Sequence, residues 1–134
     1  MVNILLGAPT LEKNIKHTSG INVLIVEDDV DTAETLWVTL LFEGYGVRVT
    51  RCRDDALHVL QNNIYHIIVL DYFMPGLGAE EFLKLVRTRS PLSKVILVSA
   101  ANQVRGLANK LGLENWIAKP VHPEKLIEML EDLS

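Results

Sequence analysis

Short apolar runs alternate with helix-like segments five times along residues 21–134, and this alternation is the strongest constraint on the fold. Half or more of the residues in the longer runs are β-branched, which is typical of strands that are covered on both faces. The connections between the runs are too long for hairpins, and each contains a segment that can cross over the sheet as a helix. The sequence therefore predicts an α/β fold, a doubly wound parallel sheet with helices on both faces.

The predicted strands cover residues 21–26, 47–52, 67–70, 95–98 and 116–118, and the second has the alternating pattern of a strand near a sheet edge. The predicted helices carry apolar residues at spacings of three and four. These residues are Ala33, Leu36, Trp37, Leu40 and Leu41 in the first helix, Ala56, Leu57 and Leu60 in the second, Phe82, Leu83 and Val86 in the third, Val104, Leu107, Ala108 and Leu111 in the fourth, and Leu126, Ile127 and Leu130 in the fifth. Because Trp37 belongs to such a stripe, we expect it in the core.

The ends of the predicted helices are marked by residues suited to free main-chain groups. Either Asp29 or Asp31 is expected to cap the first helix with its carboxylate. Gly44 and Gly112 are expected to end the first and fourth helices, because glycine tolerates the left-handed conformation found there. Pro123 suits the first turn of the last helix, where no main-chain N–H is needed.

Composition excludes several classes of function. The net charge is −4 and no basic stripe is visible, so we expect no direct nucleic-acid binding. The longest apolar runs fall far below the roughly 20 residues of a membrane helix, and no signal peptide is recognisable, so we expect no membrane association. The single cysteine, Cys52, is expected to be a buried thiol, and the four histidines lack metal-ligand spacing. A cytoplasmic location is the default expectation.

Residues 1–20 do not join the regular pattern, although Ile4-Leu5-Leu6 and the pair Leu11 and Ile15 could make a short packed segment. The piece ends in Thr18-Ser19-Gly20, a composition typical of a linker. We expect an N-terminal extension or linker over residues 1–20 and one domain over residues 21–134.

Polar or charged residues follow four of the five predicted strands. Glu27 and Asp28 follow the first strand, Asp71 the third, Ser99 the fourth and Lys119 the fifth. Each has an ordinary explanation by itself, since acids and serine cap helices or start turns and a lysine can be solvated. Because the carboxyl ends of parallel strands meet in one crevice, where ligands bind, the joint occurrence favours a functional site.

This set of side chains supports phosphoryl transfer assisted by a hard cation. Clustered carboxylates repel one another, so they retain a proton or bind a cation, and oxygen ligands with exchangeable waters suit Mg²⁺. A cation held by Asp28 and Asp71 can bridge an incoming phosphoryl group while Asp71 attacks phosphorus. Lys119 supplies a point charge for one phosphoryl oxygen, and the Ser99 hydroxyl can donate to another.

The motifs at these strand ends closely resemble those of the receiver domain of two-component response regulators, including the chemotaxis regulators. The matching segments are Val26-Glu27-Asp28-Asp29, Val69-Leu70-Asp71-Tyr72-Phe73-Met74-Pro75-Gly76, Val98-Ser99-Ala100 and Ala118-Lys119-Pro120. They occur in the family's order, and the resemblance covers about residues 21–134. It implies a receiver domain over these residues, with the flavodoxin-like (βα)5 fold and five strands in the order 2-1-3-4-5.

The resemblance also implies roles for the acidic residues. Asp71 matches the phosphoacceptor, Asp28 a direct Mg²⁺ ligand, and Glu27 an acid that acts on the metal through water. Phe73 occupies the place whose backbone carbonyl completes the metal shell, so its side chain is not implied. A pairing of Asp28 with Asp29 is a minor alternative.

Two further residues match the switch that responds to phosphorylation in the family. Ser99 corresponds to the switch hydroxyl and Lys119 to the family's lysine, whose bond to the following proline, here Pro120, is expected to be cis. Trp116 falls at the aromatic switch position, where Tyr or Phe is commoner. An indole is larger than these rings and turns inward less easily.

The function implied by the resemblance is a signalling module rather than an enzyme, apart from its own phosphorylation and dephosphorylation. A histidine kinase or a phosphotransfer protein would donate a phosphoryl group to Asp71 with Mg²⁺. The new charge would recruit Ser99 and Lys119 and change a face built from the fourth helix, fifth strand and fifth helix. That face would bind an output domain, a target protein or a second copy of the chain.

Two alternatives carry less weight. A degenerate receiver would bind partners without phosphorylation, but the acids, the hydroxyl and the lysine of the site are all present. A phosphatase of the haloacid dehalogenase type also uses an aspartate nucleophile after a parallel strand. Those enzymes resemble one another in a second acid two residues on, a place that Phe73 occupies here, so a general acid would be missing.

Overall fold

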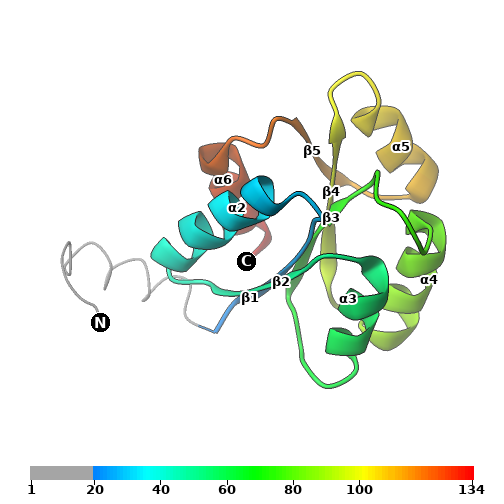
Figure 1. The fold of residues 1–134 in the computed structure, drawn as a ribbon, viewed down its shortest axis with the longest axis horizontal. Helices are drawn as coiled ribbons and strands as arrows, with labels where there is room; N and C mark the ends of the chain where they lie inside the picture. Colours follow the sequence, from blue (N-terminus) through cyan, green and yellow to red (C-terminus); the bar gives the residue numbers. More distant parts are fainter. Residues whose placement is uncertain (1–19) are drawn as a thin grey trace.

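The computed structural model describes residues 20–134, so almost all of the expected N-terminal extension lies outside the described residues. Strands and helices alternate along this range (Figure 1). They are β1 (Asn22–Val26), α2 (Val30–Phe42), β2 (Gly46–Thr50), α3 (Arg53–Leu60), β3 (Ile67–Asp71), α4 (Ala79–Arg89), β4 (Lys94–Ala100), α5 (Val104–Leu111), β5 (Asn115–Lys119) and α6 (Pro123–Leu133). Every strand and helix predicted from the sequence is present.

The five strands form one parallel sheet in the order β2-β1-β3-β4-β5, which confirms the predicted fold class. The strand β2 lies at an edge, as its alternating sequence predicted. The chain moves outward from β1 to β2 and then returns to the other side of β1 with β3. This reversal of strand order places a crevice beyond the carboxyl ends of β1 and β3.

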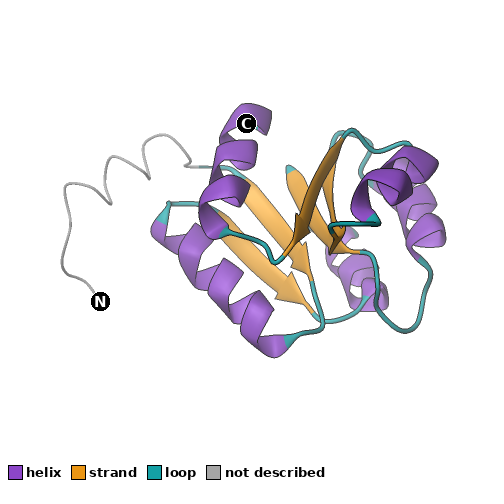
Figure 2. Cartoon of the chain, turned by 90° about the horizontal axis from the view of Figure 1, so that it is seen from above, coloured by secondary structure: helices purple, strands orange, loops and turns teal. Residues whose placement is uncertain are grey.

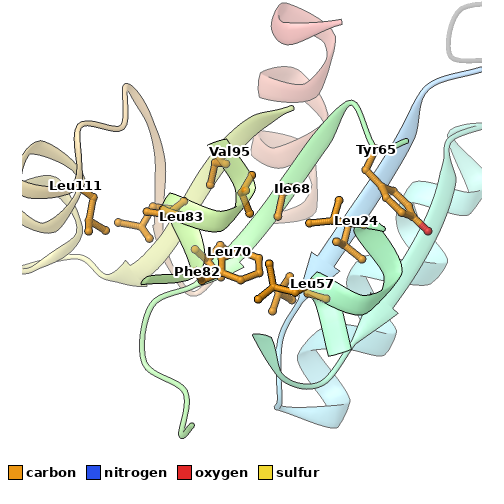
Figure 3. Packing of buried hydrophobic residues seen from close by; sticks show 14 of the residues in the cluster. Leu24, Leu57, Tyr65, Ile68, Leu70, Phe82, Leu83, Val95 and Leu111 are labelled. Atoms are coloured by element: carbon orange, nitrogen blue, oxygen red, sulfur yellow. The ribbon is translucent and has the colours of Figure 1, made fainter. Parts of the chain in front are cut away.

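Two layers of helices cover the sheet (Figure 2). The helices α2 and α6 pack on one face, where Leu36 and Leu40 meet Val23 and Ile25 of β1. On the other face, α3, α4 and α5 surround a second cluster (Figure 3). Its labelled members include Leu24, Leu57, Ile68, Leu70 and Phe82. Successive residues of β1 therefore point to opposite faces, and both faces are buried.

The helix ends follow the predicted signals. The Asp29 carboxylate accepts a hydrogen bond from the main-chain N–H of Thr32 at 2.9 Å, which makes Asp29 the cap of α2. Gly112 has a φ of 72°, the left-handed conformation expected after α5, and Pro123 occupies the first turn of α6. Of the helices in residues 20–134, none has both the length and the hydropathy that a membrane crossing needs.

Two expectations about the core are wrong. Trp37 is 40% exposed and Leu41 is 44% exposed, whereas Leu36 and Leu40 are buried. The reason is that α2 covers the end of the sheet where β2 is the edge strand, so only part of its wide apolar stripe meets other residues. Cys52 is half-buried rather than buried, because it caps α3 instead of continuing β2.

Candidate functional site

The residues predicted from the strand ends meet at one edge of the sheet. Asp71 is the last residue of β3 and pairs with Val98 of β4, so Ser99 lies one step further along the neighbouring strand. Lys119 ends β5, and Glu27 directly follows β1. Glu27, Asp71 and Ser99 are only 4%, 3% and 1% exposed. The sheet thus gathers buried polar side chains at the crevice between β1 and β3.

Three carboxylates form the centre of the site. Oxygen atoms of Glu27, Asp28 and Asp71 all lie within 4.8 Å of one another. Asp29 is engaged elsewhere, because its carboxylate accepts hydrogen bonds from the N–H and the hydroxyl of Thr32. Its main-chain N–H instead donates to Glu27 Oε2 at 3.1 Å. The geometry therefore favours Glu27 with Asp28 over the alternative of Asp28 with Asp29.

Lys119 contributes the cation of the site. Its ammonium donates to Asp71 Oδ2 at 3.0 Å and lies 3.8 Å from Glu27 Oε1. The bond between Lys119 and Pro120 is cis, as expected from the sequence. A single ammonium thus faces two buried carboxylates, which lowers the cost of burying their charge.

Burial and neighbouring charges change the protonation of this cluster. Burial raises the pKa of Glu27 to about 7, and the Asp71 carboxylate adds to the rise, while the Asp29 N–H and Lys119 oppose it. For Lys119, burial alone lowers the pKa, but the hydrogen bond and the charge of Asp71 outweigh burial and raise it. Near neutral pH, Lys119 is therefore charged, and Glu27 holds its proton to a higher pH than an ordinary glutamate when no cation is bound.

Two buried polar atoms at the site lack a hydrogen-bond partner within residues 20–134, and they are Asp71 Oδ1 and Ser99 Oγ. Leaving a buried donor or acceptor unsatisfied costs about 1–3 kcal/mol. Such atoms are expected where a ligand completes their bonding. Since the clustered donors are all carboxylate oxygens, the residues fit a hard cation such as Mg²⁺.

The two predicted aromatic positions lie in different surroundings. The Phe73 side chain is 57% exposed, and its ring meets the ring of Tyr72 edge to face with centroids 4.8 Å apart. Trp116 lies within β5, is partly buried and packs against the core cluster under α3, α4 and α5.

Sequence reasoning missed one residue next to the site, Arg53. It begins α3 and is 2% exposed, and its guanidinium donates to the main-chain carbonyls of Asp71 and Tyr72. In the sequence this arginine sits among Arg51, Asp54 and other polar residues, which is the usual composition of a solvated helix start. No local signal separates Arg53 from its exposed neighbour Arg51.

Comparison with known proteins identifies the family of the chain. A family model for the response regulator receiver domain matches residues 23–131. The chain is 33% identical over 110 residues to the response regulator protein FleR of Pseudomonas aeruginosa, a match that covers 81% of this chain and 23% of that protein. It is 31% identical over 110 residues to the transcriptional regulatory protein CpxR homolog of Haemophilus influenzae, covering 81% of this chain and 48% of the relative. The chain thus spans half or less of the length of these two relatives.

Solved structures of receiver domains have the same fold as this chain. The Francisella response regulator 1452 receiver domain superposes with a TM-score of 0.75 at 26% identity, over 85% of this chain and 96% of that one. A receiver domain protein described as CheY-like, from Methanospirillum hungatei, gives a TM-score of 0.74 at 27% identity, over 84% and 91% of the two chains. The sequence motifs, the sheet order and both kinds of comparison agree, and the chain belongs to the response regulator receiver domain family.

Proposed function

We propose that this receiver domain accepts a phosphoryl group on Asp71 and that the new charge alters the surface offered to a partner. The proposal depends on how the two oxygens of the Asp71 carboxylate are bonded. Its Oδ2 accepts a hydrogen bond from Lys119 at 3.0 Å, and its Oδ1 has no partner among the described residues. A buried aspartate in this state keeps one oxygen free as a nucleophile beside a fixed cation.

The donor in this proposal is a phosphohistidine on a histidine kinase or a phosphotransfer protein. An oxygen of Asp71 bonds to phosphorus while the P–N bond breaks, and the electron pair of that bond leaves with the imidazole, which takes up a proton. Lys119 then exchanges the carboxylate for a phosphoryl oxygen, and the Ser99 hydroxyl donates to another. The only chemistry assigned to the chain is its own phosphorylation and, with water as acceptor, its own dephosphorylation.

The proposal includes a Mg²⁺ ion. Asp28, Asp71 and the main-chain carbonyl of Phe73 would hold it directly, and Glu27 would act through a water molecule. When bound, the ion neutralises charge between the carboxylates and the phosphoryl oxygens. Support comes from the carboxylate oxygens of Glu27, Asp28 and Asp71, which lie within 4.8 Å of one another.

Ser99 and Trp116 are the proposed switch residues. Ser99 pairs in register with Ala118 of β5, two residues from Trp116, so a movement at Ser99 is close to this strand. The responding face would comprise α5, β5 and α6 and would bind an output domain, a target protein or a second copy of the chain. Moving such a switch from 1:99 to 99:1 requires about 5.5 kcal/mol of preference for one state.

The proposal is tested by incubating the chain with acetyl phosphate and Mg²⁺ and measuring its mass. We expect the mass of one added phosphoryl group, and we expect none in Asp71→Asn. The exposed acid Asp54 supplies a matched control, because Asp54→Asn makes the same chemical change on the surface at α3. Equal labelling of Asp71→Asn and the wild-type chain would refute the assignment.

Labelling, a Mg²⁺ titration and an assay of phosphoester hydrolysis together separate the two alternatives. A degenerate receiver would show neither labelling nor any response to Mg²⁺. A haloacid dehalogenase-type phosphatase would hydrolyse foreign phosphoesters steadily, which the exposed aromatic side chain of Phe73 in place of a second acid disfavours. If the chain is a receiver, each chain carries at most one phosphoryl group at a time and phosphoesters are not hydrolysed steadily.

The division of the chain and its location belong to the same proposal. We assign the receiver domain to residues 21–134 and treat residues 1–20 as an extension or linker. We also propose a cytoplasmic location, and the free Cys52 is compatible with a reducing compartment.

A further inference from the structure

Arg53 is fully buried at the start of α3, although the next residue, Asp54, is exposed. Its guanidinium donates to four main-chain carbonyls, one at the end of β3 and three in the loop that joins β3 to α4. The acceptors are Asp71 at 2.9 Å, Tyr72, Met74 at 3.4 Å and Leu77 at 2.7 Å. One side chain therefore ties the whole loop that begins at the proposed phosphoacceptor.

The choice of acceptors is selective. Within residues 71–74, Arg53 donates to the carbonyls of Asp71, Tyr72 and Met74 but not to that of Phe73. The Phe73 carbonyl is the proposed main-chain ligand of the metal ion. Bonds on both sides of Phe73 fix the direction of the loop and leave this one carbonyl available to a cation.

The charge of Arg53 is also placed close to the site. None of the ion pairs found in residues 20–134 involves Arg53. Burial lowers the pKa of its guanidinium, while the charges of Asp71 and Asp28 oppose the change, and arginine stays protonated in proteins. Burying this cation with only carbonyls as direct partners is costly, but no neutral side chain has enough donors to bond four carbonyls.

We propose that Arg53 is a positioning residue for phosphoryl transfer, which holds the loop of residues 71–77 so that the Phe73 carbonyl and the Asp71 carboxylate are arranged for Mg²⁺. The inference rests on the proposed function and extends it to a side chain from α3. A positioning role for Arg53 differs from a purely structural role in one measurable respect. Loss of Arg53 should weaken Mg²⁺ binding and labelling in protein that is still folded.

The test compares Arg53→Ala and Arg53→Lys with the wild-type chain. Amide NMR spectra during titration with MgCl₂ report both folding and the Mg²⁺ dissociation constant. The rate of labelling by acetyl phosphate is measured separately at saturating Mg²⁺. Residues that orient metal ligands typically contribute 10–100-fold to metal affinity or activity, so we expect a loss of about this size for Arg53→Ala. The Mg²⁺ affinity and labelling rate of Arg53→Lys should lie between those of the wild-type chain and Arg53→Ala, because one ammonium cannot bond four carbonyls.

Chemical rescue distinguishes the charge from the lost volume. Arg53 also lines a surface hollow with Tyr72, Phe73 and Met74, through which a small molecule can reach the space left in Arg53→Ala. Guanidinium at millimolar concentration should restore part of the Mg²⁺ affinity, and urea, its neutral counterpart, should not. Arg87→Ala is the matched control, because Arg87 donates to the Leu111 carbonyl at 2.8 Å, at the opposite edge of the sheet.

The outcomes are separable. Weaker Mg²⁺ binding by folded Arg53 variants, with normal binding by Arg87→Ala, supports the inference. If Arg53→Ala does not fold, Arg53→Lys decides by the same measurement. Wild-type affinity and labelling rate in the Arg53 variants would overturn the inference and leave the proposed function intact. A wild-type chain that neither binds Mg²⁺ nor accepts the phosphoryl group would overturn both.

Discussion

The ammonium of Lys119 lies 3.0 Å from Asp71 Oδ2 and 3.8 Å from Glu27 Oε1, so a single cation is shared by two buried carboxylates. A metal ion at the carboxylate cluster would share those same charges. Lys119 and the metal ion therefore compete electrostatically before phosphorylation, even though phosphoryl transfer is proposed to need both.

Removing Lys119 should consequently affect Mg²⁺ binding and phosphorylation of Asp71 in opposite directions. In Lys119→Ala we expect Mg²⁺ to bind several-fold more tightly, because the site loses a positive charge. Labelling by acetyl phosphate should be at least about tenfold slower, because the phosphoryl oxygens lose their cation. NMR titration and mass spectrometry measure the two quantities. Weaker Mg²⁺ binding in Lys119→Ala would contradict the competition.

The raised pKa of Glu27 predicts how stability depends on pH in protein free of metal. The folded state holds the Glu27 proton up to about pH 7, whereas an ordinary glutamate releases it near 4.5. Below pH 4.5 both states are protonated and the contribution is fully present. As pH rises from 4.5 to 7, the unfolded state ionises first and the contribution is lost, by about 1–3 kcal/mol.

Glu27→Gln is the variant that checks this pH dependence. Glutamine does not ionise, and its carbonyl oxygen can still accept the bond that Asp29 N–H donates to Glu27 at 3.1 Å. Urea unfolding at pH 5 and pH 8 should show a larger fall in stability for the wild-type chain than for Glu27→Gln. Equal pH dependence in the two proteins would refute the raised pKa.

The unpartnered hydroxyl of Ser99 predicts an unusual response to its removal. Because Ser99 Oγ is buried without a hydrogen-bond partner among the described residues, Ser99→Ala should leave the metal-free protein as stable or up to about 1 kcal/mol more stable. Ser93 is the matched control, since its hydroxyl bonds the Tyr65 carbonyl and the Ser90 hydroxyl. Ser93→Ala should cost about 1 kcal/mol in urea unfolding. Equal destabilisation of the two variants would show that Ser99 is bonded.

Two phenylalanines should differ sharply in their contribution to stability. Phe82 of α4 is completely buried in the cluster under α3, α4 and α5 (Figure 3), whereas Phe42 at the end of α2 is 62% exposed. Phe82→Ala should lower the free energy of unfolding by about 3–5 kcal/mol. Phe42→Ala should change it by no more than about 0.5 kcal/mol. Urea denaturation measures both, and a large cost for Phe42→Ala would mean that another part of the chain covers it.

The sequence predicted the sheet well, together with the side chains that gather at the carboxyl ends of its strands, because both depend on local patterns. Apolar runs that end in Glu27, Asp71 or Ser99 place these residues at strand ends, and parallel pairing brings strand ends together. Trp37 was misplaced because an apolar stripe reveals which side of a helix can be buried, but not how far the sheet extends beneath it. Arg53 was missed because its acceptors are main-chain carbonyls at least 18 residues away, and carbonyls leave no mark in a sequence.

The ionisable side chains of the site come from the first, third and last strands along the sequence. Glu27 follows the first strand, Asp71 ends the third and Lys119 ends the last, and β3 and β4 must both be in place before Lys119 can reach Asp71. No fragment that ends before β5 can hold this ion pair. A chain that is still being synthesised therefore lacks the ammonium beside Asp71 until β5 has joined the sheet. The complete set of site side chains is thus assembled only when β1, β3, β4 and β5 lie together in one sheet.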